Sequence, residues 1–118
     1  IKDVMFFQEG IINIDAIEEI FLLKSKFNLV ISDLAPNLTG IRAVDEENIS
    51  ELNIITLDTA LGYLSKSNGS FIIKTFQNSL LKKLRTEMEK SFHLVQTYKP
   101  AASKSKSAEI YLYGERPL

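Results

Sequence analysis

Several residue types that build catalytic or structural sites are missing from this 118-residue sequence. It contains no cysteine and no tryptophan, and His93 is its one histidine. Disulfide frameworks, thiolate metal sites and cysteine nucleophiles are therefore excluded, and a single histidine cannot build a histidine-rich metal centre. We expect no metal site in this chain.

Long apolar runs are absent as well. No segment approaches the roughly 18 to 20 uninterrupted apolar residues of a membrane span. Ile1–Gly10 lacks the basic start and the long apolar stretch of a signal peptide. We therefore expect a cytoplasmic protein. With 45% hydrophobic and 25% charged residues, the composition is typical of one soluble globular domain and leaves too few residues for two cores.

The charges that are present divide unevenly along the chain. Residues 1–73 contain 5 Lys/Arg and 11 Asp/Glu, a balance of −6, whereas residues 74–118 contain 9 and 4, a balance of +5. A basic C-terminal part permits an anionic partner such as a nucleic acid, although the formal net charge is only −1. Ordinary solvated surface charge explains the same pattern equally well.

Helical spacing of apolar residues predicts three helices. The first covers residues 14–23 with Asn13 as its N-cap, the second covers residues 49–65, and the third follows Asn78 or Ser79 as its cap. The residues expected to face the core are Leu52, Ile54, Leu57, Leu61 and Leu64 in the second helix and Leu80, Leu81, Leu84 and Met88 in the third.

Short apolar runs between these helices predict strands. Residues 27–32 and 71–76 are typical of buried parallel strands, and the first of them stops abruptly at Asp33. Residues 92–97 and 109–113 alternate like a pair of strands. Strands alternating with helices, followed by a closing hairpin, indicate an α/β layered sheet.

Turn-forming residues mark the connections. Residues 34–47 are expected to form a loop, Gly69 is expected to take a left-handed turn after the second helix, and residues 99–108 form a polar Ser/Lys-rich connection.

Asp33 and Lys74 are the first candidates for a functional site. Ligands of open α/β sheets bind at the carboxyl ends of the strands, so both residues are expected to face one crevice. A lysine within a buried strand is costly unless it has a carboxylate partner or a chemical role. On residue type alone, a structural ion pair and a functional lysine both remain open.

Four sequence blocks resemble the FtsJ-like family of ribosomal RNA 2′-O-ribose methyltransferases. The resemblance extends over nearly the whole chain, and each block falls on the element where the family needs it. The blocks are Ser32–Asn37, Gly40 with Ala43–Asp45, Gly69–Gln77, and Lys99-Pro100 with Ser103–Tyr111.

This resemblance implies a class I (Rossmann-like) methyltransferase fold, with a mostly parallel sheet and a C-terminal antiparallel hairpin. It also implies S-adenosylmethionine as the methyl donor and a Lys-Asp-Lys-Glu catalytic tetrad. Asp33 is similar to the aspartate that lies against the donor, Lys74 to the lysine that accepts the proton of the ribose 2′-hydroxyl, and Glu109 to the closing glutamate. The first lysine of the tetrad has no counterpart in these residues.

The sequence departs from the family pattern near its start. In the family a Gln-Gly-Asp turn contacts the adenine side of the donor, whereas Gln8 is followed here by Glu9 and Gly10, so Glu9 is the one local carboxylate that could substitute. The glycine-rich loop and the first strands of the family are also missing. Residues 1–118 are therefore expected to form a single partial methyltransferase domain, its C-terminal two thirds. An unpaired apolar sheet edge would then favour self-association.

Further residues are candidates for contact with RNA. Lysines of the basic C-terminal part are expected to bind phosphates, with a plain solvated surface as the alternative. Asn37 is expected to shape the substrate entrance or only to form an Asx-turn. His93 is expected to be a partly buried sheet residue. The lysines are Lys82, Lys83, Lys104 and Lys106, together with Lys99 and the neighbouring Arg85.

The function that the resemblance implies is methylation of a ribose 2′-hydroxyl, of a uridine, in large-subunit ribosomal RNA. A 2′-hydroxyl is a very weak acid, so the site must align its oxygen with the methyl group and accept its proton. Burial lowers the pKa of such a lysine, whereas nearby carboxylates raise it. Two alternatives remain: a transfer-RNA ribose methyltransferase, and a catalytically inactive RNA-binding or assembly module.

Overall fold

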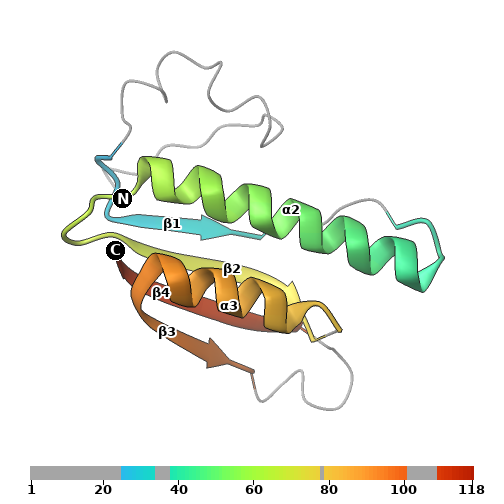
Figure 1. The fold of residues 1–118 in the computed structure, drawn as a ribbon. Coiled ribbons are helices and arrows are strands. Elements are labelled where there is room, and N and C mark those ends of the chain that lie inside the picture. The colour runs from blue at the N-terminus through green and yellow to red at the C-terminus, as the bar shows by residue number, and fades with distance from the viewer. Residues whose placement is uncertain (1–24, 34–37, 78, 101–108) are drawn as a thin grey trace.

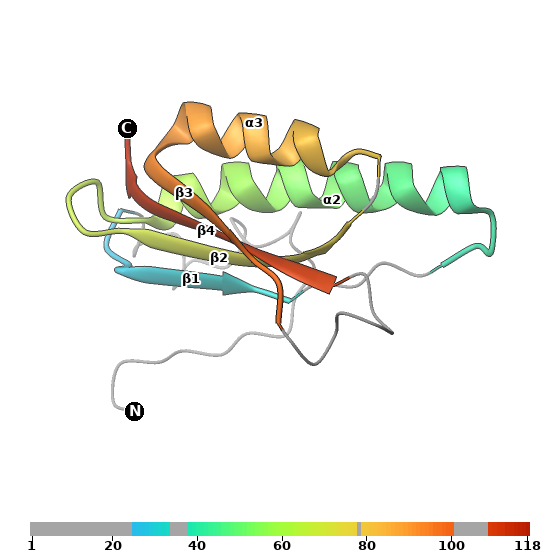
Figure 2. The same cartoon turned by 90° about the horizontal axis from the view of Figure 1, so that it is seen from below.

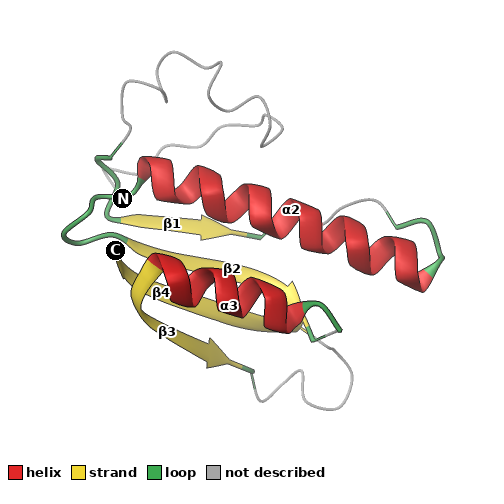
Figure 3. Ribbon diagram, in the orientation of Figure 1, coloured by secondary structure: helices red, strands yellow, loops and turns green. Residues whose placement is uncertain are grey.

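The computed structural model describes residues 25–33, 38–77, 79–100 and 109–118 (Figure 1). The predicted first helix, and the candidate residues Glu9, Asn37, Lys104 and Lys106, lie outside these ranges. The described elements are β1 (Leu29–Ser32), α2 (Arg42–Tyr63), β2 (Ser70–Phe76), α3 (Leu81–Ser91), β3 (Phe92–Tyr98) and β4 (Glu109–Pro117), coloured by type in Figure 3.

The four described strands form one sheet in the order β1-β2-β4-β3. β1 pairs with β2 in parallel, and β4 pairs antiparallel with both β2 and β3. β1, β2 and β3 therefore run in one direction, and β4 is inserted between β2 and β3 in the opposite direction. This arrangement confirms the predicted α/β fold with its C-terminal antiparallel hairpin, in a mixed sheet in which three of the four described strands run in the same direction.

Both described helices cover the same face of the sheet, as Figure 2 shows. In β2, alternate side chains turn toward the helices, so Phe71, Ile73 and Thr75 are buried. Burial of this apolar surface is the main source of stability in such a layered fold. The core consists of Leu57, Ala60, Leu64, Phe71, Ile73, Leu84, Met88, Phe92 and Leu112.

Helix α2 begins at Arg42, earlier than the predicted start at residue 49, so the last part of the expected loop over residues 34–47 is helical. Asp45 lies in the first turn and accepts hydrogen bonds from the backbone amide and the hydroxyl of Thr39, at 2.7 and 2.8 Å, and from the amide of Gly40 at 3.2 Å. Gly40 has a φ of 89°, which favours glycine. This clamp, which apolar periodicity does not reveal, fixes the start of the helix.

The buried face of α2 is more polar than predicted. Ser50, Asn53 and Thr56 are buried beside Leu57 and Ala60, whereas Leu52, Ile54 and Leu61 are only half-buried. Each buried polar side chain needs a partner. The Asn53 amide donates to the Thr75 hydroxyl at 2.7 Å, and the Thr56 hydroxyl donates to the Leu52 carbonyl at 2.7 Å.

Two predictions about turn residues were wrong. Gly69 does not adopt the left-handed conformation; a side chain is excluded there because a Cβ atom would lie 2.5 Å from the Ser65 carbonyl oxygen. Ser79 does not cap α3 with its side chain, because its hydroxyl donates to Glu46 at 3.0 Å. The N-cap position of α3 is Leu80, with no side-chain cap.

Two expectations about burial also fail. β1 is the edge strand of the described sheet, and its residues Leu29 and Ile31 are 49% and 65% exposed, so the strand is not fully buried. His93 is exposed rather than partly buried, because it lies on β3, at the opposite edge. None of the described helices is long and apolar enough to cross a membrane.

Candidate functional site

Three candidate residues meet at one end of the central strands. Asp33 directly follows β1, which runs parallel to β2, so its position corresponds to the carboxyl half of β2 where Lys74 lies. Glu109 is the first residue of the antiparallel β4 and pairs with Phe76 at the end of β2. Because β4 runs in the opposite direction, its start and the ends of β1 and β2 lie at the same edge of the sheet.

Lys74 makes ion pairs with both carboxylates. Its ammonium contacts the Asp33 carboxylate directly and lies 3.4 Å from Oε2 of Glu109. The Lys74 side chain is 17% exposed, whereas those of Asp33 and Glu109 are 67% and 36% exposed. The cation is therefore held at the rim of the sheet, with its partners more open to solvent than itself.

The two carboxylates also control the protonation of the lysine. The hydrogen bond to Asp33 raises the pKa of Lys74 above its ordinary value. Partial burial opposes this effect, and the negative charges of Asp33 and Glu109 reinforce it. The described residues therefore favour the charged ammonium at neutral pH, so this cluster by itself holds and orients a cation.

A second lysine lies near this edge. Lys99, just after β3, donates to Oε1 of Gln77 at 3.1 Å, and Gln77 directly follows β2. This contact places the Lys99 ammonium beside the end of the strand that carries Lys74. The sequence placed Lys99 among RNA-binding candidates, but its partner came only from the tertiary structure.

The predicted basic residues of α3 divide into two kinds. Lys82 and Lys83 are exposed. Arg85 instead packs against β3, where its guanidinium donates to the Thr97 hydroxyl and, at 3.3 Å, to the Val95 carbonyl. Arg85 therefore ties the helix to the strand, and Lys90 pairs with Glu87 at 3.7 Å, so Lys82 and Lys83 form the exposed basic surface near the start of this helix.

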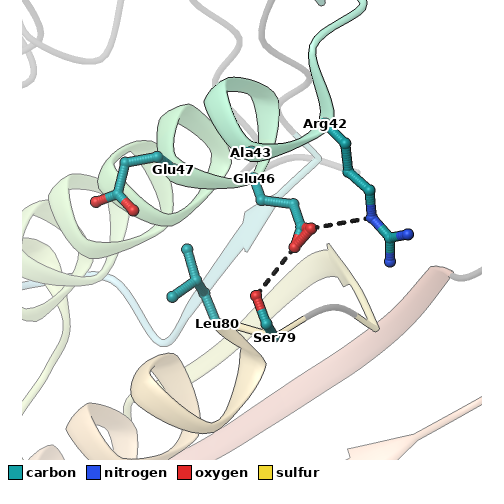
Figure 4. Close-up of a pocket in the computed structure, with 6 residues that line it drawn as sticks. All are labelled: Arg42, Ala43, Glu46, Glu47, Ser79 and Leu80. Carbon is teal, nitrogen blue, oxygen red and sulfur yellow. Dashed lines mark hydrogen bonds and ion pairs between the residues drawn. The ribbon is translucent and has the colours of Figure 1, made fainter.

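A pocket of about 420 Å³ lies between the first turn of α2 and the segment before α3 (Figure 4). Glu46 joins the two walls by accepting from Ser79 at 3.0 Å, and it also pairs with Arg42 of its own helix at 3.3 Å. None of Asp33, Lys74 and Glu109 lines this pocket, and sequence reasoning did not find it. Its lining residues are Arg42, Ala43, Glu46, Glu47, Ser79 and Leu80. No group of three or more metal-binding side chains occurs within the described ranges.

Comparison with known proteins identifies the family of this chain. The sequence profile of FtsJ-like methyltransferases matches residues 1–116. The chain belongs to the FtsJ-like methyltransferase family. The resemblance drawn from the four sequence blocks is therefore confirmed.

Individual FtsJ-like proteins match over most of this chain. It is 38% identical over 114 residues to "Ribosomal RNA large subunit methyltransferase E" of Buchnera aphidicola, covering 95% of this chain and 54% of that protein. It is 41% identical over 97 residues to the protein of the same name from Methanococcus aeolicus, covering 82% of this chain and 36% of that protein. The chain spans about half the length of the curated relatives it matches.

A solved structure shares the fold. The crystal structure of a ribosomal RNA methyltransferase from Plasmodium falciparum matches with a TM-score of 0.73 and 29% sequence identity. The match covers 94% of this chain and 58% of that one. The sheet and its two described helices thus belong to a methyltransferase fold.

Proposed function

We propose that the natural protein containing this chain transfers a methyl group from S-adenosylmethionine to a ribose 2′-hydroxyl, that of a uridine, in large-subunit ribosomal RNA. The observation that carries the proposal is the Lys74 ammonium between Asp33 and Glu109 at the carboxyl edge of the sheet. Family membership and the printed names of the relatives support the methyl transfer and the RNA class.

Asp33 fits the side of the methyl donor. S-adenosylmethionine supplies an electrophilic methyl group on a positively charged sulfonium. A carboxylate at a strand tip that is 67% exposed can attract this charge while one of its oxygens binds Lys74. Asp33 would therefore hold the donor and the lysine at once.

Lys74 fits the side of the acceptor. We assign it the role of accepting the proton of the 2′-hydroxyl, which it can do only as a neutral amine. Because the carboxylates raise the pKa of Lys74, the neutral fraction is small at neutral pH, and methyl transfer should accelerate as the pH rises. Glu109 would hold the amine in position from the other side.

The test is methyl incorporation into ribosomal RNA with labelled S-adenosylmethionine, combined with calorimetric titration of the donor. Lys74→Ala should abolish transfer and leave donor affinity nearly unchanged, whereas Asp33→Ala should weaken both. The product should resist alkaline cleavage at one position, because a methylated 2′-oxygen cannot attack the adjacent phosphate. Turnover by Lys74→Ala near the normal rate would remove the lysine from this role.

The choice of RNA is tested in the same assay. Large-subunit ribosomal RNA should accept the methyl group, and a transfer-RNA pool should not. Preferential labelling of transfer RNA would favour the alternative substrate. Binding of RNA without any methyl incorporation would favour the inactive RNA-binding or assembly module.

A further inference from the structure

An aromatic row extends from Lys74 across the sheet. In the register of β2 and β4, Lys74 lies opposite Tyr111, and in the register of β3 and β4, Tyr111 lies opposite Tyr98. Directly opposed residues of paired strands share one face of a sheet. The three side chains therefore project from the same face, in the order Lys74, Tyr111, Tyr98.

This face is the one opposite to α2 and α3. The neighbours of the row in sequence, Ile73 and Leu112, are 1% and 0% exposed and belong to the core beneath the helices. Alternation along each strand turns Lys74 and Tyr111 away from that core. Figure 2 shows that both helices lie on one face of the sheet.

Tyr98 is the most exposed member of the row. It is 64% exposed, whereas Tyr111 and Lys74 are half-buried. Neighbouring strands lie about 4.8 Å apart, so Tyr98 is about 10 Å from the strand of Lys74. An RNA that presented a ribose to Lys74 would therefore have to reach Tyr98 with a nearby nucleotide.

A basic residue adjoins Tyr98 in the sequence. Lys99 follows it directly and is anchored to Gln77 beside the strand of Lys74. Residues 74–118, which contain the row, have a balance of +5, but Lys82, Lys83, Arg85 and Lys90 of this part lie on α3, on the other face of the sheet. An exposed aromatic ring provides a stacking surface for a base, and a lysine next to it in the sequence provides a partner for the phosphate.

We propose that Tyr98 stacks on an unpaired base of the RNA whose ribose is held at Lys74, and that Tyr111 forms the floor between them. This inference rests on the proposed function for the identity of the substrate. Unpaired bases are commonly recognised by stacking on aromatic side chains, a contact available to every base and lost in a duplex. Tyr98 would thus select single-stranded or flipped-out nucleotides and contribute to RNA affinity, not to the chemical step.

The first experiment separates KM from kcat in the natural protein that contains this chain. Tyr98→Ala should raise the KM for RNA about tenfold, with kcat and donor affinity unchanged, because stacking occurs equally in the ground and transition states. Tyr98→Phe and Tyr98→Trp keep a ring and should retain normal KM. Leu94→Ala, which removes another exposed apolar side chain from β3, is the matched control and should change nothing.

The second experiment measures binding without catalysis. A short single-stranded RNA with a fluorescent base should be quenched by the unaltered protein and much less by Tyr98→Ala. The same sequence in a duplex should bind with equal affinity to both. The loss caused by Tyr98→Ala should persist at raised salt, whereas the loss caused by Lys99→Ala should shrink, because only the latter removes a phosphate contact.

The outcomes distinguish this inference from the proposed function. If the unaltered protein methylates RNA and Tyr98→Ala has normal KM, stacking is wrong and the function stands. If Tyr98→Phe is as defective as Tyr98→Ala, the hydroxyl and not the ring is responsible, which also overturns the stacking proposal.

Conversion of a dimer to a monomer by Tyr98→Ala, with RNA binding unchanged, would assign this face to a second copy of the chain. An unaltered protein that binds single-stranded RNA through Tyr98 without methylating it would refute the function alone.

Discussion

The sheet has two different faces, a covered face beneath α2 and α3 and an open face on the other side. The face beneath α2 and α3 buries apolar side chains from every other position, such as Ile73 and Leu112. The opposite face carries Lys74, Tyr111 and Tyr98 at the alternate positions. If the proposed function holds, adjacent residues of one strand serve stability and chemistry separately, so a substitution at one should leave the other property largely intact.

The largest expected effect is on the chemistry of the open face. Lys74→Ala should reduce methyl transfer at least a hundredfold, since general base catalysis typically contributes about 10²–10⁴-fold. Its melting temperature should change little, because ion pairs with solvent-accessible partners contribute about 0–1 kcal/mol. Methyl incorporation and thermal unfolding, measured on the same preparation, would check both. A strongly destabilised Lys74→Ala variant would refute the view that the two faces serve stability and chemistry separately.

The matched change on the covered face is Ile73→Ala, one residue earlier in β2. Ile73 is 1% exposed and packed in the core. Its truncation should lower the free energy of unfolding by about 2–5 kcal/mol. Activity per folded molecule should remain near normal, which denaturant unfolding and methyl incorporation at low temperature would show.

Gly114 tests how closely the covered face is packed. A Cβ atom at this position would lie 2.6 Å from the ring of Phe92, which is itself 2% exposed. Gly114→Ala should therefore destabilise the fold by about 1–3 kcal/mol through overpacking. Gly62→Ala is the control, since nothing lies within 4 Å of the corresponding Cβ and the residue is exposed in α2. It should be neutral or slightly stabilising, because alanine favours helix.

The pH dependence of methyl transfer sharpens the role of the charges on the open face. Glu109 contributes to the raised pKa of Lys74, so Glu109→Gln should lower that pKa and move the rise of kcat to lower pH. A pH–rate profile of the two proteins would measure this shift. A rate that instead falls as the pH rises would show that the ammonium, and not the neutral amine, is the active form.

The smallest expected effect concerns Asp45, which lies away from both faces of the sheet. Its hydrogen bonds with the Thr39 amide lower the pKa of Asp45 below the ordinary value of 3.8. A lowered pKa in the folded state stabilises the protein above pH 3.8, and this contribution is lost as the pH falls through the folded value. Asp45→Asn should thus lower the melting temperature by a few degrees at neutral pH and not in strong acid, as thermal scans at both pH values would show.

Local pattern predicted most elements of the described fold. β2 was predicted as 71–76 and observed as Ser70–Phe76, and the 92–97 strand as Phe92–Tyr98. Such runs are readable because alternation and β-branched composition are properties of neighbouring residues. The start of α2 was missed because three hydrogen bonds between Thr39, Gly40 and Asp45 determine it, and these follow no hydrophobic period.

For the candidate site, too, some features could be predicted from the sequence and others could not. The end of the strand at Asp33 and the unusual position of Lys74 were visible in the sequence, and the family resemblance added Glu109. Their roles in catalysis stay predictions. The contacts of Lys99 with Gln77 and of Ser79 with Glu46 join residues 22 and 33 positions apart, so no local pattern could predict them.

The sequence by itself determined the alternation of strands and helices, the residue types available for chemistry and the family. Only the tertiary structure decided which residues share an edge, because strand order and register are set by packing between distant segments. Because β4 lies between β2 and β3, Glu109 lies beside Lys74. For the same reason, Tyr98 lies in one row with Tyr111 and Lys74. The physical reason is that side chains alternate with a period of two, so a shift of one residue in either register would place two residues of the row on opposite faces of the sheet.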